Sequence, residues 1–498
     1  MKDVATPGPS GPVTAGGGEL RLVRALGPGM AVAVVVGNVI GSGIFAKPGT
    51  IAAEARDFPL ILLAWITGGV LCALGALCYA ELATMLPRAG GLYVYLREAY
   101  GKPVAFLFGW NELLFNRPAS IGALSWIFIG SLAQALQWQM ETIPRVLLAI
   151  LLIAALAWVN VLGVIWGGRV QGVTTLIKAT FLGLIALLPF VLWPFIESSI
   201  DVAHYSSTVT QPDGTSGWRF GVILLAVMWA YNGWHGITPV AEEVRDPQRN
   251  IPLALFGGVG LLALLYISAN VAYHGVLSME QMAASGEHAA EKMLDELLGP
   301  VGGMVMSGVV MCSVFGAINS NLLIAPRISF AMGRDGVFFR QLGWIHSSYR
   351  TPAVAIVVQA VMAVLLVVAS AVLVEWAPVL QEAVAGWPTL ESLLAGLETT
   401  SIFNLLTNFV IFAVSIFYAL AALAVVVLRY KHPEWPRPYR TWGYPLVPLL
   451  FVAFYAWFLG QVYLGKPLEA NAGLVLIALG LPVYYAWRRR EEKLKAER

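Results

Sequence analysis

The 498-residue chain is 58% hydrophobic and only 12% charged, with a formal net charge of +2. A soluble domain carries about 25% charged residues, so this composition indicates a protein that crosses a membrane many times. The basic residues are scattered between apolar segments rather than clustered, which argues against a nucleic-acid-binding surface.

Twelve apolar segments are long enough to cross a bilayer, which requires about 20 residues each. They lie near residues 28–50, 59–86, 103–136, 144–163, 170–194, 219–243, 252–277, 299–333, 352–374, 400–428, 443–465 and 470–487. With loops assigned alternately to the two sides, 22 of the 31 Lys and Arg residues fall on the side of the N-terminus and 6 on the other. Cytoplasmic loops are enriched in Lys and Arg, so both termini are predicted to be cytoplasmic in a cell membrane.

Three segments are predicted to lie outside the spans. Residues 1 to about 18 are rich in Gly, Pro, Ser and Thr, and residues 1–25 are expected to form a disordered cytoplasmic tail. Residues 488–498 form a basic cytoplasmic tail. The outer segment near 375–398 has apolar residues at helical spacing, which predicts a short amphipathic helix on the surface.

The sequence gives no indication of an enzyme. Its three cysteines lie in apolar segments without metal-ligand spacing, and we expect buried, reduced thiols at Cys72, Cys78 and Cys312. No nucleophile–base pair and no appended soluble domain is visible. We therefore expect no metal and no cofactor.

The first span contains Gly37-Asn38-Val39-Ile40-Gly41-Ser42-Gly43-Ile44-Phe45, with three glycines within seven residues. Each Gly costs up to about 1 kcal/mol in a helix relative to Ala, so this stretch predicts a helix break. Unwound backbone is tolerated inside a membrane only where it faces protein or a water-filled cavity. A half-helix starting near Ile44 would direct free N–H groups into that cavity and could bind a carboxylate. The alternative is a glycine seam where two helices pack closely.

The sixth span repeats this pattern in Trp229-Ala230-Tyr231-Asn232-Gly233-Trp234-His235-Gly236-Ile237-Thr238-Pro239. It is the first span of a second group of five, as span one is of the first group. A fainter echo pairs Arg117-Pro118 in span three with Pro326-Arg327 in span eight. The matching positions predict two five-span repeats, 26–194 and 219–428, followed by two C-terminal helices within 443–487.

An ordered set of motifs runs almost from end to end of the chain, at 41–45, 79–82, 87–93, 112–118, 169–178, 242–252 and 429–438. With these motifs the chain resembles the amino acid–polyamine–organocation superfamily, and within it the L-type and alanine-serine-cysteine-type amino acid exchangers. The resemblance implies an all-α membrane protein of twelve transmembrane helices. It also implies a 5+5 inverted repeat of the leucine-transporter type, with helices 1 and 6 broken.

The resemblance places the substrate between the two helix breaks. Its carboxylate would meet the N–H groups of Ser42, Gly43 and Ile44, and its ammonium would meet carbonyls freed by unwinding. The full set of candidate substrate-binding residues is Val39, Ile40, Gly41, Ser42, Gly43, Ile44, Trp229, Ala230, Asn232 and Gly233. No Asp or Glu is evident there to pair a cationic side chain, which favours neutral amino acids.

Three residues of span six have alternative interpretations. Trp229 occupies the position of a gating aromatic in the family, although a core or interfacial Trp is also common in membrane helices. Asn232 stands where the family often has Gly or Asp, and its volume favours small substrates. His235 stands where Asn is frequent, and is either a proton carrier or a hydrogen-bonded structural residue.

Lys178 lies deep in span five, where an ionisable group is costly and is a functional candidate by default. In sodium-coupled relatives of this fold, a cation site lies beside span one and touches spans five and eight. The resemblance puts the Lys178 ammonium at that place, which implies sodium-independent transport. The alternative is snorkelling to the cytoplasmic interface.

Four further charges were assigned less specific roles. Arg117 needs a partner, but Glu112, five residues earlier, would lie on the wrong face of a helix. Arg327 is expected to snorkel to the cytoplasmic surface. Glu242 and Glu243 are expected to form a cytoplasmic gate or loop ion pair, close in sequence to Arg245 and Arg249, and the alternative is a pair of catalytic carboxylates.

Together these features predict a secondary transporter that moves neutral L-amino acids by alternating access and exchange. One alternative is a proton-coupled symporter in which Lys178 or His235 titrates, and another is a membrane sensor or enzyme. The loop at 137–143 has no cysteine, so a disulfide-linked heavy subunit, as found in animal relatives, is not expected.

Overall fold

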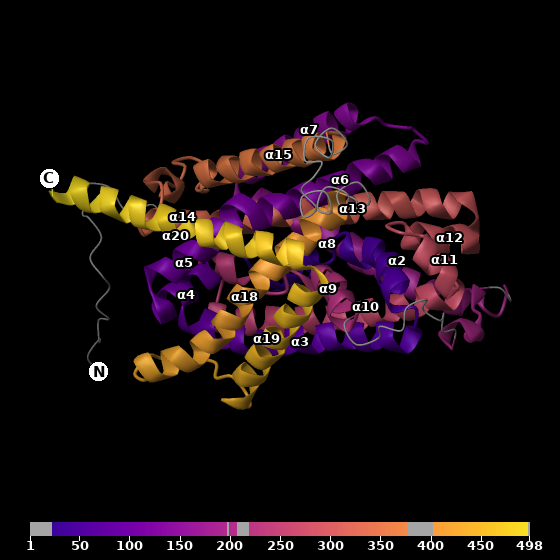
Figure 1. Cartoon of the computed structure of the whole chain (residues 1–498), viewed down its shortest axis with the longest axis horizontal. Coiled ribbons are helices and arrows are strands. Elements are labelled where there is room, and N and C mark those ends of the chain that lie inside the picture. Colours follow the sequence, from indigo (N-terminus) through magenta and orange to yellow (C-terminus); the bar gives the residue numbers. More distant parts are fainter. Residues whose placement is uncertain (1–21, 197–198, 207–218, 377–401, 497–498) are drawn as a thin grey trace, which may run out of the picture.

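The computed structural model describes residues 22–196, 199–206, 219–376 and 402–496, which form a bundle of helices (Figure 1). The first half contains α1 (Pro28–Val39), α2 (Gly43–Ala55), α3 (Phe58–Met85), α4 (Leu92–Tyr100), α5 (Lys102–Asn111), η1 (Glu112–Asn116), α6 (Arg117–Ala135), α7 (Thr142–Leu162), α8 (Val164–Leu192) and η3 (Val202–Tyr205). The second half contains α9 (Arg219–Tyr231), η4 (Thr238–Glu243), α10 (Pro247–Val276), α11 (Met279–Ala284), α12 (Ala289–Leu298), α13 (Pro300–Ile324), α14 (Pro326–Arg334), η5 (Arg340–Gly343), α15 (Ala353–Glu375), α18 (Ile402–Lys431), α19 (Leu446–Gly465) and α20 (Pro467–Ala496).

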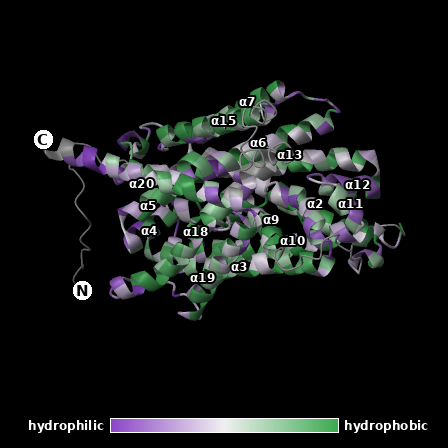
Figure 2. Cartoon of the chain, in the orientation of Figure 1, coloured by the Kyte–Doolittle hydropathy of each residue, from purple (hydrophilic) through white to green (hydrophobic). Residues whose placement is uncertain are grey.

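The predicted spans are all present. Within the described residues, 11 helical stretches are long and apolar enough to cross a membrane. The sixth predicted span is divided, because its apolar part, Phe220–Tyr231, is short and leads into η4. Figure 2 shows hydrophobic residues along the long helices and hydrophilic ones gathered toward the ends of the bundle. The predicted all-α, multi-pass membrane fold is confirmed.

The interruptions of the helices occur in matched pairs, as the predicted inverted repeat requires. Span one is divided into α1 and α2, and span six into α9 and η4. Span three contains the π-helical turn η1 just before Arg117, and span eight is divided between α13 and α14 just before Pro326. The halves of span one have different neighbours, since α1 packs on α8 and α10 whereas α2 packs on α9 and α11. This is the twelve-span, leucine-transporter-type fold, and the exact repeat limits stay predictions.

The start of the described chain packs against the bundle. Leu22 is buried against Ala89 and Phe330. The Leu26 N–H donates to the Glu243 carbonyl at 3.0 Å, and its carbonyl accepts from the Arg245 N–H at 2.9 Å. The buried Leu22 and the backbone pairing of Leu26 therefore anchor the start of the described chain, whereas the limits of the predicted tail stay a prediction.

At the other end of the chain, residues 488–496 continue α20 as helix. The amphipathic helix predicted near 375–398 falls almost entirely on residues 377–401, outside the described part of the chain.

The three cysteines are free thiols. Cys72 and Cys78 are buried as predicted, but Cys312 is only half-buried. The prediction of burial is wrong for Cys312 because it lies on the outward stripe of α13, about two helical turns from the exposed Met304 and Val305.

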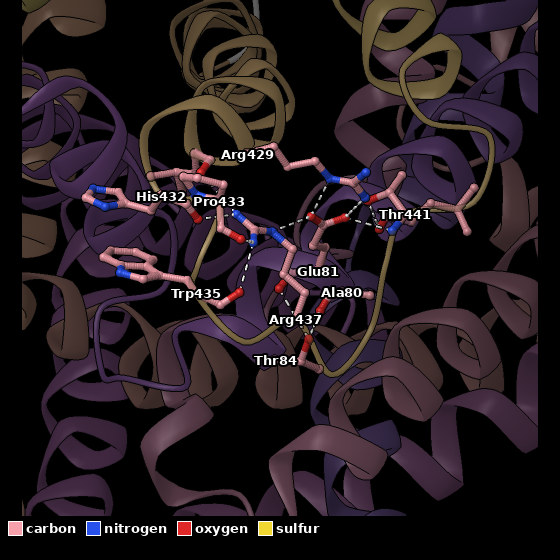
Figure 3. Close-up of polar contacts among 11 residues, drawn as sticks. Ala80, Glu81, Thr84, Arg429, His432, Pro433, Trp435, Arg437 and Thr441 are labelled. Carbon is pink, nitrogen blue, oxygen red and sulfur yellow. Dashed lines mark hydrogen bonds and ion pairs between the residues drawn. The ribbon is translucent and has the colours of Figure 1, made fainter. Parts of the chain in front are cut away.

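The buried carboxylate of Glu81, near the end of α3, fastens the C-terminal spans to span two (Figure 3). It accepts from Arg429 Nε at 2.9 Å, from Arg429 Nη2 at 2.7 Å and from the Thr441 N–H at 2.7 Å. A bidentate guanidinium–carboxylate pair is among the stronger polar contacts in proteins. Span two is thereby joined both to the end of span ten and to the loop that precedes span eleven.

Arg437 completes this cluster and caps α18. Its Nε lies 3.6 Å from Glu81 Oε1. Its two terminal nitrogens donate to carbonyls at and just after the end of α18, those of Leu428 (3.1 Å), His432 (2.7 Å), Pro433 (3.1 Å) and Trp435 (2.8 Å). The last carbonyls of a helix lack intrahelical hydrogen-bond partners. The Arg437 guanidinium supplies donors to these carbonyls and so stabilises the end of α18.

We predict that Glu81→Gln lowers the thermal unfolding midpoint of the purified protein by several degrees. The substitution leaves two guanidinium groups without their anion, at a cost on the order of 3 kcal/mol. Glu434→Gln is the matched control, because the Glu434 carboxylate lies in the loop that contains Arg437 and Thr441 but is 66% exposed. Equal midpoints for the two variants would contradict the fastening role of Glu81.

Candidate functional site

The break in span one leaves a helix start inside the bundle. α1 ends at Val39 and α2 begins at Gly43, with Ser42 as the capping residue. The Ser42 carbonyl accepts from the N–H groups of Phe45 and Ala46, at 3.1 and 2.8 Å, so the N–H groups before them precede the first intrahelical bonds. Ser42 Oγ makes no capping bond and is buried without a partner among the described residues. These are unused hydrogen-bond donors in the interior of a membrane protein.

The break in span six lies against that of span one. α9 ends at Tyr231, and Gly233 adopts a φ of +97°, a conformation that favours glycine. A Cβ atom on Gly233 would lie 2.1 Å from Asn38 Nδ2, which instead donates to the Gly233 carbonyl at 2.9 Å. The two interrupted helices are therefore joined by a direct side-chain contact.

Tyr266 on α10 bridges the two breaks from behind. Its hydroxyl lies 3.0 Å from the Val39 carbonyl and 3.1 Å from the Ala230 carbonyl, and can donate its proton to either. Val39 and Ala230 are both among the predicted substrate-binding residues. Each carbonyl keeps a second lone pair for another donor.

Lys178 on α8 is fully buried and reaches the break in span one. Its ammonium donates to the carbonyls of Gly37 and Ile40, the latter at 2.5 Å, and lies 3.5 Å from the carbonyl of Ser313. Ser313 Oγ adds a bond to the same Ile40 carbonyl at 3.2 Å. The side chain points into the bundle rather than to the surface, so it does not snorkel.

A cavity of about 30 Å³ lies between the two breaks. It is lined by Asn38, Val39, Gly41, Ser42, Gly43, Arg117, Ser120, Leu124, Trp229, Asn232, Gly233, Ala317 and Asn321. Seven of the ten residues predicted for the substrate site line it. The other three are Ile40, whose carbonyl faces Lys178, Ala230, whose carbonyl faces Tyr266, and Ile44, which is buried one residue into α2.

Several lining residues were not predicted as site residues, namely Asn38, Arg117, Ser120, Leu124, Ala317 and Asn321. Most come from spans three and eight, which pack against each other beside the cavity. A polar residue within an apolar span is a sequence signal for a cavity-lining position, and Arg117 and Asn321 both carry that signal. The nonpolar Leu124 and Ala317 gave no such signal.

The partner of Arg117 is Glu112, contrary to the prediction. Arg117 Nε donates to Glu112 Oε2 at 2.7 Å, and Arg117 Nη1 donates to Asn321 Oδ1 at 3.0 Å. In an α-helix, residues five apart lie about 140° from each other around the axis. In η1 the Arg117 N–H instead bonds the carbonyl of Glu112, and this wider i→i+5 turn brings both side chains to one face.

A second buried ion pair closes one end of the bundle. Arg327 Nε and Nη2 donate to Glu243 at 2.9 and 3.3 Å, and neither side chain is more than 1% exposed. The predicted snorkelling of Arg327 is wrong, because the carboxylate that ends span six lies beside it in the interior. Neighbouring Glu242 accepts from the Ala89 N–H at 3.0 Å and pairs with Arg334 at 3.4 Å. The expected ion pairs exist, but with span eight rather than with Arg245 or Arg249.

Comparison with known proteins identifies the family. Residues 26–478 match the family described as amino acid permease. The chain belongs to this family. The amino acid permease match covers both helix breaks, all of the cavity residues and the Glu81 cluster.

Curated relatives align over nearly the whole permease. The serine/threonine exchanger SteT of Bacillus subtilis is 31% identical over 94% of this chain and 98% of the relative. The large neutral amino acids transporter small subunit 2 of Mus musculus is 30% identical over 96% of this chain and 83% of the relative. The Asc-type amino acid transporter 1 of Mus musculus is 30% identical, over 95% and 83%. The predicted membership of a family of amino acid exchangers is confirmed.

The span-six side chains of this permease fall on two sides of the unwound segment. Trp229 lines the cavity and is 7% exposed. Asn232 also lines it and accepts a hydrogen bond from Tyr418 on α18 at 2.9 Å. His235 lies behind, with its ring 4.9 Å from the ring of Tyr418 and 5.6 Å from that of Tyr79. Asn232 therefore links the cavity to this aromatic cluster through its hydrogen bond with Tyr418.

We predict that Gly43→Ala reduces amino acid uptake at least tenfold. The added Cβ would lie 2.4 Å from Ala230 Cα, so the two breaks must move apart, and a cost above about 1.4 kcal/mol corresponds to tenfold. Gly257→Ala is the matched control, because a Cβ there meets nothing within 4 Å. Uptake would be measured in proteoliposomes and expressed per amount of folded protein. Near-wild-type uptake by Gly43→Ala would contradict the proposed site.

We also predict that Lys178→Ala sharply reduces uptake, because it strips the donor from carbonyls that have no helical partner. Lys292→Ala, at a position 46% exposed, should leave uptake unchanged. Initial rates would be measured in sodium and in potassium buffers for each protein. Wild-type kinetics in the Lys178 variant would show that the ammonium has no part in transport.

Proposed function

We propose that this permease exchanges neutral L-amino acids across the membrane without sodium. The observation that carries the proposal is the meeting of two helix breaks at one cavity. The N–H groups of Ser42, Gly43 and Ile44 would bind the α-carboxylate. The carbonyl of Asn232, with the remaining lone pairs of the Val39, Trp229 and Ala230 carbonyls, would bind the ammonium. Opposed helix ends satisfy both charges of a zwitterion without a net charge on the protein.

The lining of the cavity supports a neutral side chain. Arg117 is its cationic residue, and the Glu112 carboxylate neutralises that guanidinium. The other polar side chains that line the cavity near Arg117 are those of Ser120, Asn232 and Asn321. Asn232, held by Tyr418, occupies volume that a large side chain would need, which favours small substrates. A relative named as a serine/threonine exchanger agrees with this preference.

Lys178 supports independence from sodium. Its ammonium contacts backbone carbonyls of spans one and eight, where a bound cation would otherwise be needed to hold the unwound backbone. A fixed charge on a side chain does the same without an ion gradient. Transport would then follow the gradients of the amino acids themselves, as in exchange.

Alternating access would require the two groups of spans to move relative to each other. Spans one, two, six and seven would rock against spans three, four, eight and nine, with Trp229 closing over the substrate. The Glu243–Arg327 pair joins span six to span eight, so it would have to separate when the cavity opens at that end. We place this end and both termini in the cytoplasm from the distribution of Lys and Arg.

The remaining assignments extend the proposal. The permease would reside in the cell membrane, with repeats at 26–194 and 219–428 and two further helices within 443–487. Its partners would be neutral L-amino acids and lipid. No disulfide-linked heavy subunit is proposed, since the segment 137–143 lacks a cysteine.

The test is uptake of labelled amino acids into proteoliposomes that are empty or preloaded with unlabelled amino acid. We expect uptake to require internal amino acid, to be unaffected by replacing sodium with choline, and to be inhibited most by serine, threonine and alanine among the twenty. Uptake into empty vesicles driven by an inward proton gradient would replace exchange with symport. In that case His235, whose Nδ1 is buried without a partner in the described structure, is the residue to substitute with Asn.

A further inference from the structure

A second cavity lies at the start of α1, away from the helix breaks. Its volume is about 390 Å³, and it is lined by Ala25, Leu26, Gly27, Pro28, Gly29, Met30, Arg169 and Arg245. The lining is apolar except for the two arginines and backbone groups. A Cβ atom on Gly27 or Gly29 would meet nothing within 4 Å, so the space is open on that side. The cavity combines an apolar floor with a cationic rim.

The two guanidinium groups have no carboxylate within ion-pair distance among the described residues. Arg245 Nε donates to the Arg24 carbonyl at 3.2 Å, which holds the side chain in place without neutralising it. Arg169 lies over the ring of Trp166, 5.3 Å from its centroid. Two positioned cations beside one cavity repel each other, so binding of an anion between them is favourable.

The starts of the surrounding spans indicate that the cavity lies near the level where lipid head groups meet the hydrocarbon. Three spans begin around it, at Pro28, at Trp166 and at Pro247. Trp166 is 56% exposed, as expected for an aromatic side chain at the membrane interface. One or two turns further along the same spans, exposed apolar residues such as Val173 and Leu253 begin the lipid-facing surface. A ligand here would have its polar end at the interface and its apolar end in the bilayer.

We propose that this cavity binds an anionic phospholipid, with its phosphate between Arg169 and Arg245 and its glycerol and upper acyl chain against Pro28 and Met30. The apolar floor favours a lipid over a free phosphate ion, because a small anion would leave that surface uncovered. The bound lipid would contact the segment that pairs through Leu26 with Glu243 and Arg245. Occupancy would therefore stabilise the closed arrangement of spans one and six at this end.

The test measures lipid binding to the purified full chain by native mass spectrometry in detergent, with phosphatidylglycerol and phosphatidylcholine of identical acyl chains. We expect preferential retention of phosphatidylglycerol, and about a fivefold loss of apparent affinity for each guanidinium removed in Arg169→Gln and Arg245→Gln. Arg249→Gln with Arg440→Gln is the matched control, since both side chains are exposed and neither lines the cavity. This control should retain the preference.

Three results would overturn the proposal. They are an unchanged preference for phosphatidylglycerol in the Arg169/Arg245 double variant, an equal loss in the control, and displacement of the lipid by glycerol 3-phosphate at matched concentration. The last result would assign the cavity to a soluble phosphate compound. Thermal unfolding midpoints of each variant without added lipid show whether it is folded. The measurement does not involve transport, so it stands or fails separately from the proposed exchange.

Discussion

A buried ammonium group bound to backbone carbonyls holds the first membrane span in its broken form. Unwinding frees carbonyls that neither lipid nor a helix can satisfy, and each would cost several kcal/mol in an apolar interior. Lys178 supplies donors to the carbonyls of Gly37 and Ile40 from span five, and Ser313 adds one from span eight. Because these donors come from two other spans, five and eight, the break persists only when those spans are packed against span one.

Other polar contacts of the interior lie around the same broken segment. With Ile40 committed to Lys178, the opposite side of the broken segment is turned toward the cavity, where Ser42 and Gly43 face Trp229 and Asn232. Tyr266 fixes the distance between the two breaks by reaching a carbonyl on each. Beyond the cavity, Glu243 and Arg327 join spans six and eight. During a transport cycle, the contacts between moving spans, such as Glu243–Arg327, would have to break and re-form. The contacts around Lys178 would stay intact.

Features set by local chemistry could be predicted from the sequence, and features set by distant partners could not. The breaks follow from Gly41, Gly43 and Gly233, since glycine in a membrane helix weakens it wherever the neighbours lie. The Arg117–Glu112 pair was missed because a π-helical turn changes which residues share a face of the helix. The local sequence of residues 112–116 does not specify that turn. Arg327 was misplaced because its carboxylate partner is 84 residues earlier in the chain. Which freed carbonyl faces Lys178, Tyr266 or the cavity likewise depends on packing between spans.

The central claim is that two opposed helix breaks bind both charges of a zwitterion through backbone groups. Equilibrium displacement of a labelled amino acid from the detergent-purified permease tests it directly, with three competitors built on one side chain. The free amino acid should displace the label. Its methyl ester lacks the carboxylate and its N-acetyl derivative lacks the ammonium. Each derivative should bind at least about 100-fold more weakly, a loss of about 2.7 kcal/mol in binding free energy. Displacement by the ester at the concentration that suffices for the free amino acid would contradict the account.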